Sequence, residues 1–522
     1  MKNSVPELPS SWARCPIGEV VEPDVTQTNP TGDSFTYVDI GSIDNKLKRI
    51  TEAKTLPSAE APSRARQLLQ AHDVLVSMTR PNLNAVTIVP PNLAGSIGST
   101  GFNVLRAKGV EPRWLYYYVQ TTEFIEAMSS LVQGALYPAV RPKDIRGHPL
   151  PVAPFSEQVR VADEIERHLT RLDAGVEALK RVQAQLKRYR ASVLKAACEG
   201  RLVPTEAELA RREKRDYEPA DKLLARLLKE RRARWEADQL AKMKVAGKLP
   251  KDDKWKAKYV EPEQPDTEML PPLSEGWSWA SLDQLSWTAG YGTSEKCDYE
   301  QTGLPVLRIP NISQGQLDPS DLKFASTALE IDPGSEVALG DLIIVRTNGS
   351  KDLIGRGAVV VARPARKYYF ASYLIRYRLI ANEGLLRHIS AIWHAPYART
   401  WVQRHAATSA GQYNISMGTL ARFPVPLPPA AEQSRITAQV DALLSVGGAA
   451  EPIIAAAYSR ANRLRQALLK LAFEGGLVPQ DPNDEHAAKL LKRISAAATN
   501  EPRTKQSRTK RPGDTTKMKA TR

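Results

Sequence analysis

The stretch CEGRLVP at residues 198–204 returns, with two changes, as FEGGLVP at residues 473–479. Each copy ends a segment that opens with Glu-Gln-x-Arg, at Glu157 and at Glu432, and the two openings have the same offset along the chain as the two endings. The longer segments 148–204 and 423–479 align without a gap. Self-similarity at a fixed period indicates that one structural unit is present twice.

Apolar residues in the first copy follow a seven-residue period, which is typical of a helix that supercoils around a partner. Proline residues before this stretch and Gly200 after it predict a helix over about 157–199. In the second copy, Gly447, Gly448 and Pro452 interrupt the pattern and predict a kink or break, with the helix restarting near Pro452. We expect the two helices to pair as an antiparallel coiled coil; packing of each within a local bundle is the alternative. The seam residues are Ile165, Leu172, Leu179, Leu186, Val193, Val440, Ile454 and Leu468.

The repeat extends beyond the helices. Trp12 corresponds to Trp277, AHDVLVSMTR (71–80) to LGDLIIVRTN (339–348), and EPADKLLARLL (218–228) to EHAAKLLKRIS (485–495). Short β-rich runs and turns predict an α+β fold with two globular domains built on twisted β-sheets, separated by the long helices in a pseudo-two-fold repeat. The predicted segments are a first domain (1–150), a long helix (151–204), a charged helix and connector (205–265), a second domain (266–425), a second long helix (426–479), a terminal helix (480–500) and a basic disordered tail (501–522).

Charge points to a polyanionic partner. The net charge is +15 and the pI is about 9.5, and clustered Lys and Arg favour binding to a phosphate backbone. The N-terminus lacks the apolar core of a signal peptide, and we expect no apolar run close to the ~20 residues of a membrane span. Three distant cysteines suggest neither a disulfide framework nor a metal site. These features favour a cytoplasmic protein that does not bind membranes.

Motifs of catalysis are missing from the sequence. It contains no GxxxxGK[ST], no GxGxxG, no HExxH and no paired Cys ligands. Asp252 and Asp253 lie in a run of charges that is typical of a solvated surface. We therefore expect a binding protein without catalytic or metal-binding residues, and a nuclease or methyltransferase is the least favoured function. A basic coiled-coil scaffold that binds DNA without sequence preference is the alternative.

The two-fold layout, the EQxR openings, the EGxLVP endings and the Trp12 and Trp277 starts together resemble the specificity subunit of type I restriction-modification systems. The resemblance covers about residues 8–495. It implies that each domain recognises one half of a split double-stranded DNA target and that the helices set the gap between the halves. It also implies partners: two adenine methyltransferase subunits, and translocase/endonuclease subunits. S-adenosylmethionine, ATP and Mg would belong to these partners, so no cofactor is expected here.

Loops after the matching strands are the predicted DNA-reading surface. Arg pairs bidentately with guanine, and Asn or Gln with adenine. The predicted base-reading residues are Arg80, Asn82, Asn84, Tyr137 and Arg141 in the first domain, and Arg346, Asn348, Gln412, Tyr413 and Asn414 in the second. The predicted phosphate contacts are Lys46, Lys48, Arg49 and Lys351. Asn- and Gly-rich loops also occur for backbone reasons alone, which is the alternative explanation.

Overall fold

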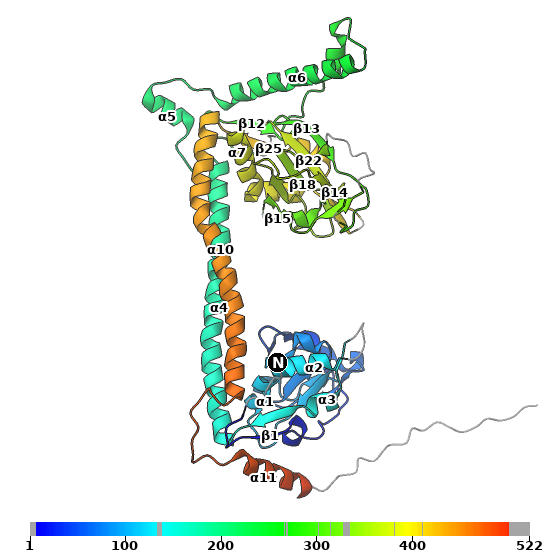
Figure 1. The fold of residues 1–522 in the computed structure, drawn as a ribbon, viewed down its shortest axis with the longest axis vertical. Helices are drawn as coiled ribbons and strands as arrows, with labels where there is room; N and C mark the ends of the chain where they lie inside the picture. Colours follow the sequence, from blue (N-terminus) through cyan, green and yellow to red (C-terminus); the bar gives the residue numbers. More distant parts are fainter. Residues whose placement is uncertain are drawn as a thin grey trace, which may run out of the picture. The chain divides into compact units, whose positions relative to one another are not determined.

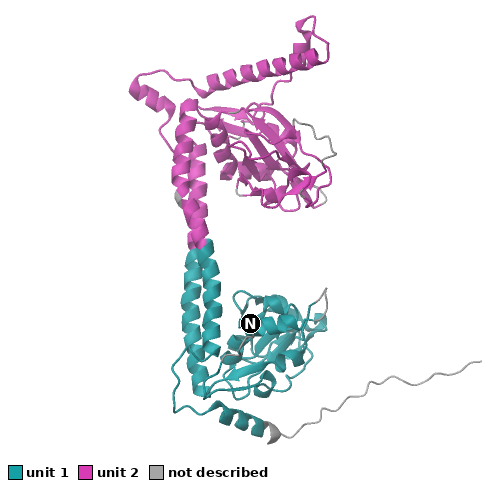
Figure 2. Ribbon diagram, viewed as in Figure 1, with its two compact units in different colours: residues 1–179, 455–522 teal, residues 180–454 magenta. Residues whose placement is uncertain are grey.

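The computed structural model describes residues 7–500 except 133–137, 266, 268–269, 301, 314, 327–334, 381 and 410. The chain divides into two compact units, residues 1–179 with 455–522 and residues 180–454 (Figures 1 and 2). Each unit combines β-sheets with helices, which confirms the predicted mixture of helix and sheet. Tyr137 and the predicted tail 501–522 lie outside the described residues.

The first unit is built on a sheet of order β10-β7-β8 and a second of order β5-β2-β9-β6. Strand β7 is buried throughout, because Val74, Leu75 and Val76 pack on both sides of their sheet. The strands of this unit are β1 (Ala13–Pro16), β2 (Ser34–Val38), β3 (Ile43–Asp44), β4 (Arg49–Ile50), β5 (Lys54–Pro57), β6 (Ala65–Leu68), β7 (Val74–Ser77), β8 (Val86–Ile88), β9 (Ile97–Ser99), β10 (Phe102–Leu105) and β11 (Pro149–Val152). Its shorter helices are α1 (Pro112–Tyr118), α2 (Thr122–Ser130), α3 (Pro142–Arg146) and α11 (Ala487–Asn500).

The second unit has sheets of order β13-β22-β18-β20, β17-β14-β21 and β19-β24-β23. Its buried strand β18 corresponds to β7 in the sequence repeat. The strands are β12 (Ser278–Ser281), β13 (Ser286–Tyr291), β14 (Leu304–Leu307), β15 (Ile312–Ser313), β16 (Gln316–Leu317), β17 (Lys323–Ala325), β18 (Asp341–Val345), β19 (Thr347–Asn348), β20 (Gly357–Val359), β21 (Tyr369–Phe370), β22 (Leu374–Leu379), β23 (Ala407–Ser409), β24 (Gln412–Asn414) and β25 (Pro424–Leu427). The helices are α5 (Glu206–Glu213), α6 (Ala220–Val245), α7 (Glu383–His394), α8 (Pro396–His405) and α9 (Met417–Ala421).

One strand pairing recurs in both units. The first strand of each domain pairs antiparallel with the strand that leads into a long helix, β1 with β11 and β12 with β25. Cys15 opposes Leu150 in the first pair, and Ala280 opposes Val425 in the second. Each pairing therefore joins the beginning and the end of its domain next to the long helix.

Two helices of 44 residues, α4 (Phe155–Cys198) and α10 (Ala430–Phe473), contribute to both units. In the first unit, the beginning of α4 and the end of α10 share a core that includes Ile165, Leu169, Leu469 and Phe473. In the second unit, the end of α4 and the beginning of α10 share a different core (Figure 2). That core includes Val193, Leu194, Ile436 and Val440.

Burial varies among the predicted seam residues. Ile165, Val193, Val440 and Ile454 are buried. Leu172 and Leu468 are half-buried and pack against the core of the first unit. Leu179 and Leu186, which lie further along α4 from the two ends of the helix, are also half-buried.

The predicted break in the second long helix is wrong. Pro452 lies inside α10, which continues on both sides of it. A proline in a helix interior removes one backbone hydrogen bond and crowds the preceding turn. The buried side chains of Val440 and Ile454 fix the backbone on either side of this defect, so tertiary packing outweighs the local preference.

The expectation about apolar length also needs correction for α10. An 18-residue window of this helix has a mean hydropathy of 1.4, so by length and composition this one helix among the described residues is apolar enough to cross a membrane. The apolar residues at its two ends belong instead to the protein cores shared with α4.

Candidate nucleic-acid interface

In the first unit, Arg80 lies just beyond the end of buried strand β7. Its backbone is left-handed, with φ of 49°, and its N–H donates to Pro138 O at 2.8 Å. A short 3-10 turn over Pro81–Leu83 follows and leaves Asn82 exposed. Val140 N donates to Met78 O at 2.9 Å, so the segment after β7 lies against the segment that leads to Arg141.

The second unit has the same backbone arrangement. Ile415 N donates to Arg346 O at 2.9 Å, which matches the bond between Val140 and Met78. Strand β19 pairs with β24, and Asn348 opposes Tyr413 while Thr347 opposes Asn414. The structure thus brings together the two predicted groups of this domain, one after β18 and the other on β24, although they are far apart in the chain.

Arg346 is held on an aromatic ring. Its guanidinium carbon lies 4.7 Å from the centroid of Tyr291, on β13. Within the described part of the chain, two buried polar atoms of this site have no hydrogen-bond partner, Arg346 Nε and Asn414 Oδ1. Unsatisfied buried polar atoms are costly, so a ligand that supplied partners would bind favourably. Tyr291 was not predicted from the sequence, because nothing in its local sequence links it to a loop much further along the chain.

Two predicted DNA contacts are contradicted, Asn84 and Lys48. Asn84 is only 7% exposed, and its Nδ2 donates to Val119 O at 2.8 Å. Lys48 Nζ donates to Asn84 Oδ1 at 2.8 Å. Burial and the nearby Arg465 lower the pKa of Lys48 to about 8. Asn84 is therefore part of the domain interior, and the Lys48 ammonium is held by Asn84.

The remaining predicted basic residues are at the surface. Lys46, Arg49 and Lys351 are exposed, and no ion pair with another described residue engages them. Arg141 is also exposed, but its Nε lies 3.2 Å from Asp144 Oδ2 at the start of α3. Lys46, Arg49 and Lys351 therefore have free charges for a phosphate backbone, whereas Arg141 must first leave Asp144.

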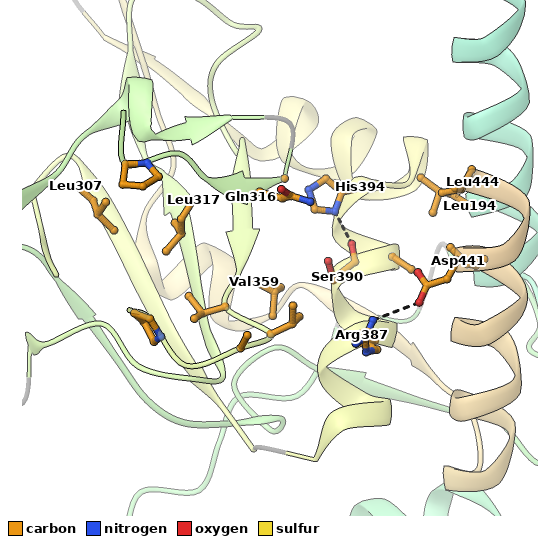
Figure 3. Close-up of a pocket in the computed structure, with 18 of the residues that line it drawn as sticks. Leu194, Leu307, Gln316, Leu317, Val359, Arg387, Ser390, His394, Asp441 and Leu444 are labelled. Atoms are coloured by element: carbon orange, nitrogen blue, oxygen red, sulfur yellow. Dashed lines mark hydrogen bonds and ion pairs between the residues drawn. The ribbon is translucent and has the colours of Figure 1, made fainter. Parts of the chain in front are cut away.

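Each unit has a cavity between its globular domain and its part of the long helices. The larger cavity, of about 750 Å³, is in the second unit (Figure 3). Arg387 there is paired with Asp441 at 3.3 Å, and His394 Nδ1 lies 2.6 Å from Ser390 O. Burial lowers the pKa of His394. These polar groups are engaged with protein partners and do not form a nucleophile and base.

The smaller cavity, of about 460 Å³, is in the first unit. Glu166 and Arg465 line it, and these residues correspond in the sequence repeat to Asp441 and Arg190, which line the larger cavity. Among the residues described in the two units, no group of three or more His, Cys, Asp and Glu is arranged to hold a metal ion.

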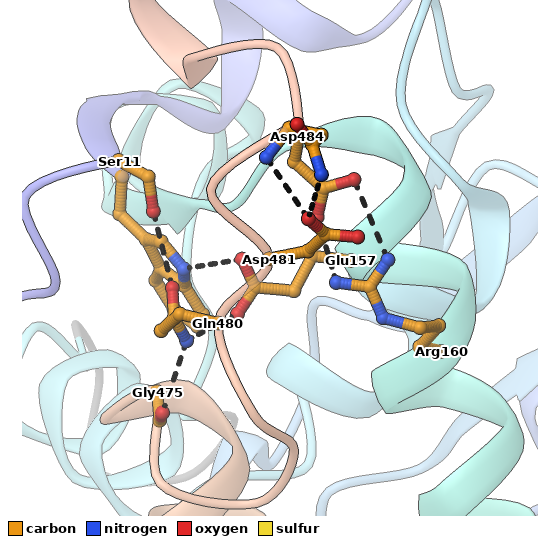
Figure 4. A network of polar contacts seen from close by, with 9 residues as sticks. Ser11, Glu157, Arg160, Gly475, Gln480, Asp481 and Asp484 are labelled. Carbon is orange, nitrogen blue, oxygen red and sulfur yellow. Dashed lines mark hydrogen bonds and ion pairs between the residues drawn. The ribbon is translucent and has the colours of Figure 1, made fainter.

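The repeated EQxR motif forms a polar network that we call the clasp. In the first unit, Glu157 accepts from Trp12 Nε1 at 3.1 Å and from Gln480 Nε2 at 2.6 Å, and Arg160 pairs with Asp484 at 2.6 Å (Figure 4). The start of α4 is thereby joined to the start of the domain and to the segment after α10. Burial raises the pKa of Glu157.

The second unit has an equivalent clasp. Glu432 accepts from Trp277 Nε1 at 2.9 Å and from the backbone N–H of Glu206 at 2.8 Å. Arg435 pairs with Glu206 at 2.6 Å. The start of α10 is thereby joined to the second domain and to the segment after α4. The clasp explains why the Trp and the EQxR motif recur together, since the glutamate of each EQxR motif accepts a hydrogen bond from the Trp of its own unit.

Comparison with known proteins gives consistent relatives. The chain is 23% identical over 391 residues to the type I restriction enzyme EcoKI specificity subunit of Escherichia coli (strain K12), covering 73% of this chain and 71% of that protein. It is 22% identical over 398 residues to the StySPI specificity subunit of Salmonella potsdam, covering 74% and 72%. The chain is homologous to type I restriction enzyme specificity subunits. The resemblance predicted from the sequence is therefore confirmed.

A solved structure supports the same fold. A chain from a type I R-M system matches with a TM-score of 0.57 and 23% identity, covering 90% of this chain and 99% of that chain. The shared fold therefore extends over nearly all of the present sequence. No family model matches the sequence.

Proposed function

We propose that this chain is the noncatalytic, sequence-specific DNA-binding subunit of a type I restriction-modification complex, and that its two recognition domains read the halves of a bipartite target. One observation carries the proposal: the same backbone hydrogen bond follows the central buried strand of both units. Val140 N donates to Met78 O in the first unit, and Ile415 N donates to Arg346 O in the second. In the first unit, the exposed residues Arg80 and Asn82 lie next to this hydrogen bond. In the second unit, half-buried Asn348 and exposed Gln412 lie next to it. Two equivalent surfaces with different side chains suit two different half-sites.

The chemistry of these residues fits the edges of bases. Arg reads guanine, and Asn or Gln reads adenine, through paired hydrogen bonds in the major groove. Lys46, Arg49 and Lys351 supply charge for nearby phosphates, which position a protein without specifying sequence. The stacked Arg346 enters such a contact with little loss of side-chain freedom.

Partner subunits supply the chemistry in this proposal. We assign the docking surfaces to the long helices, which expose large apolar side chains that a protein partner would cover: Val182, Tyr189 and Ile453 in the second unit, and Leu464 and Leu471 in the first. A repeated chain offers equivalent surfaces to two copies of one partner. We assign them to two adenine methyltransferase subunits, which bring S-adenosylmethionine. Translocase/endonuclease subunits bring ATP and Mg, and the complex acts in the cytoplasm.

The test is to coexpress the chain with its methyltransferase partner and to map methylated adenines across the host DNA by long-read sequencing. A motif of two specific parts with a constant gap is expected. The partner expressed without this chain is the control and should leave the motif unmethylated. An active complex that methylates without any motif would overturn the proposal and favour a basic scaffold.

A further inference from the structure

Helix α6 extends well beyond the core that anchors it. Ala220, Leu223 and Leu227 are buried at its beginning, and residues 240–249 are almost all exposed. Helix α11 corresponds to α6 in the repeat and also begins with a buried Ala, at position 487, but it is 14 residues long against 26. The recognition domain therefore does not require the last turns of α6 for its own packing.

An aromatic cluster fixes the extension at its base. Trp235 stacks on Trp255 with centroids 5.9 Å apart and meets Tyr259 edge-on at 5.3 Å. Arg231 joins this cluster to the domain, since it donates to Tyr259 Oη at 3.0 Å and to Ser286 O at 2.9 Å. Residues 242–258, which we call the tip, are thus held to the domain through Trp255 of this cluster.

The tip holds seven lysines and two aspartates. Lys254 and Lys256 pair with carboxylates. No ion pair with another described residue engages the other five, which are Lys242, Lys244, Lys248, Lys251 and Lys258. Five free ammonium groups on a short, anchored segment form a strong local positive charge.

Most of the excess positive charge of the chain lies in two segments of the sequence. Residues 220–260 contain thirteen Lys and Arg against six Asp and Glu, a net charge of +7 in a chain of +15. The sequence after the matching helix α11, 501–522, has eight Lys and Arg against two acidic residues. One segment contains α6 and the other comes directly after α11, which are matching helices of the repeat. Most of the excess positive charge therefore lies outside the loops that are proposed to read bases.

We propose that the tip binds the phosphate backbone of duplex DNA outside the base-reading contacts and supplies sequence-independent affinity. This inference rests on the proposed function, because it assumes that the complex binds DNA. Lysine is suited to this role, since its flexible ammonium contacts phosphates without geometric selection. An acidic protein is the competing partner, because Val245 and Leu249 are also exposed on the tip.

The experiment uses the complex of the full chain with its methyltransferase subunits. Lys242, Lys244, Lys248, Lys251 and Lys258 are changed together to Gln, and Asp252 and Asp253 are changed to Asn in a separate variant of opposite sign. Dissociation constants for a cognate and an unrelated duplex are measured over a range of salt concentrations. The slope of log K against log salt should become shallower by about 0.9 for each phosphate that the Lys-to-Gln variant no longer binds.

We expect the Lys-to-Gln variant to bind both duplexes more weakly by a similar factor, with a shallower slope and an unchanged methylated motif. The Asp-to-Asn variant should bind both more tightly. Unchanged affinity and slope in both variants would overturn the inference, as would dissociation of a protein subunit from the Lys-to-Gln complex. Failure of the proposed function looks different, since the unmodified complex itself would then show no preference for any sequence.

Discussion

Arg346 and Arg80 belong to different units, so each should affect one half of the target. Arg346→Ala removes the guanidinium that stacks on Tyr291, and with it the proposed bidentate contact to a base, which would account for about 1–3 kcal/mol of base discrimination. We expect the methylation map to show one relaxed half-site and one intact half-site. Arg80→Ala should relax the other half.

Lys351→Ala is the matched control for Arg346→Ala. This residue is exposed in the same unit and is assigned to phosphate, so its replacement should weaken binding to all sequences without changing the motif. Relaxation of both half-sites by either Arg variant, or of neither, would contradict the assignment.

Glu432 tests the clasp at the scale of a single carboxylate. Glu432→Ala leaves Trp277 Nε1 and the N–H of Glu206 without an acceptor, so we expect unfolding to become easier by about 2–4 kcal/mol. Glu432→Gln keeps an acceptor for one of these two donors, because they bond different oxygens of the carboxylate, and should destabilise the chain less. Urea denaturation followed by tryptophan fluorescence measures both. Equal destabilisation by the two variants would show that the hydrogen bonds contribute little.

The clasp also predicts a dependence of stability on pH. Burial raises the pKa of Glu432 above its ordinary value of 4.5, so the folded state favours the protonated carboxyl. The stabilisation that comes from protonating this carboxyl in the folded state is fully present below pH 4.5. It is lost as the pH rises through the raised pKa of Glu432. Glu432→Gln should remove this part of the pH dependence. The difference in unfolding free energy between wild type and variant, measured across that range, checks the sign.

At the scale of elements, α10 contains glycines that its fold does not require. A Cβ at Gly447 would meet only Leu186 Cδ2, at 3.9 Å, and one at Gly448 would meet no atom within 4 Å. Ala at each position should stabilise the helix by about 0.5–1 kcal/mol. Thermal unfolding followed by circular dichroism measures the gain.

Gly475 is the control for these substitutions. It follows the end of α10 with φ of 79°, and a Cβ there would collide with Pro9 Cγ. Gly475→Ala should therefore destabilise the chain. A gain in stability at Gly475, or a decrease at Gly447 and Gly448, would show that this helix is constrained differently from the structure described.

At the scale of the molecule, the long helices are expected to set the gap between half-sites. Seven residues that continue the seam would be inserted into α4 after Leu179 and into α10 after Ile454. Seven helical residues add about 10 Å, which corresponds to roughly three base pairs of DNA. We expect methylation of unchanged half-sites with a gap longer by about that amount. The same insertion at Gly247, in the turn of the tip, should leave the gap unchanged, and an unchanged gap in the helix variant would contradict the ruler.

The sequence by itself predicted the elements that depend on local patterns. Its heptad period predicted α4 to within a short distance of both observed ends, and Gly200 has the positive φ expected of a residue that ends a helix. The duplicated motifs also predicted a resemblance to specificity subunits, which the comparisons confirm. Such patterns are local or periodic, so they can be recognised without knowing which distant residues meet.

Only the tertiary structure decided which side chains are free. Asn84 and Lys48 were predicted as surface contacts, but they bind each other, and Asn84 also binds Val119. Tyr291 carried no sequence signal, yet it positions Arg346. Trp114 and His388 differ in type, but each bonds the matching carbonyl oxygen, of Pro151 and of Pro426. Burial and hydrogen bonding arise from contacts between distant segments, which residue order alone does not specify.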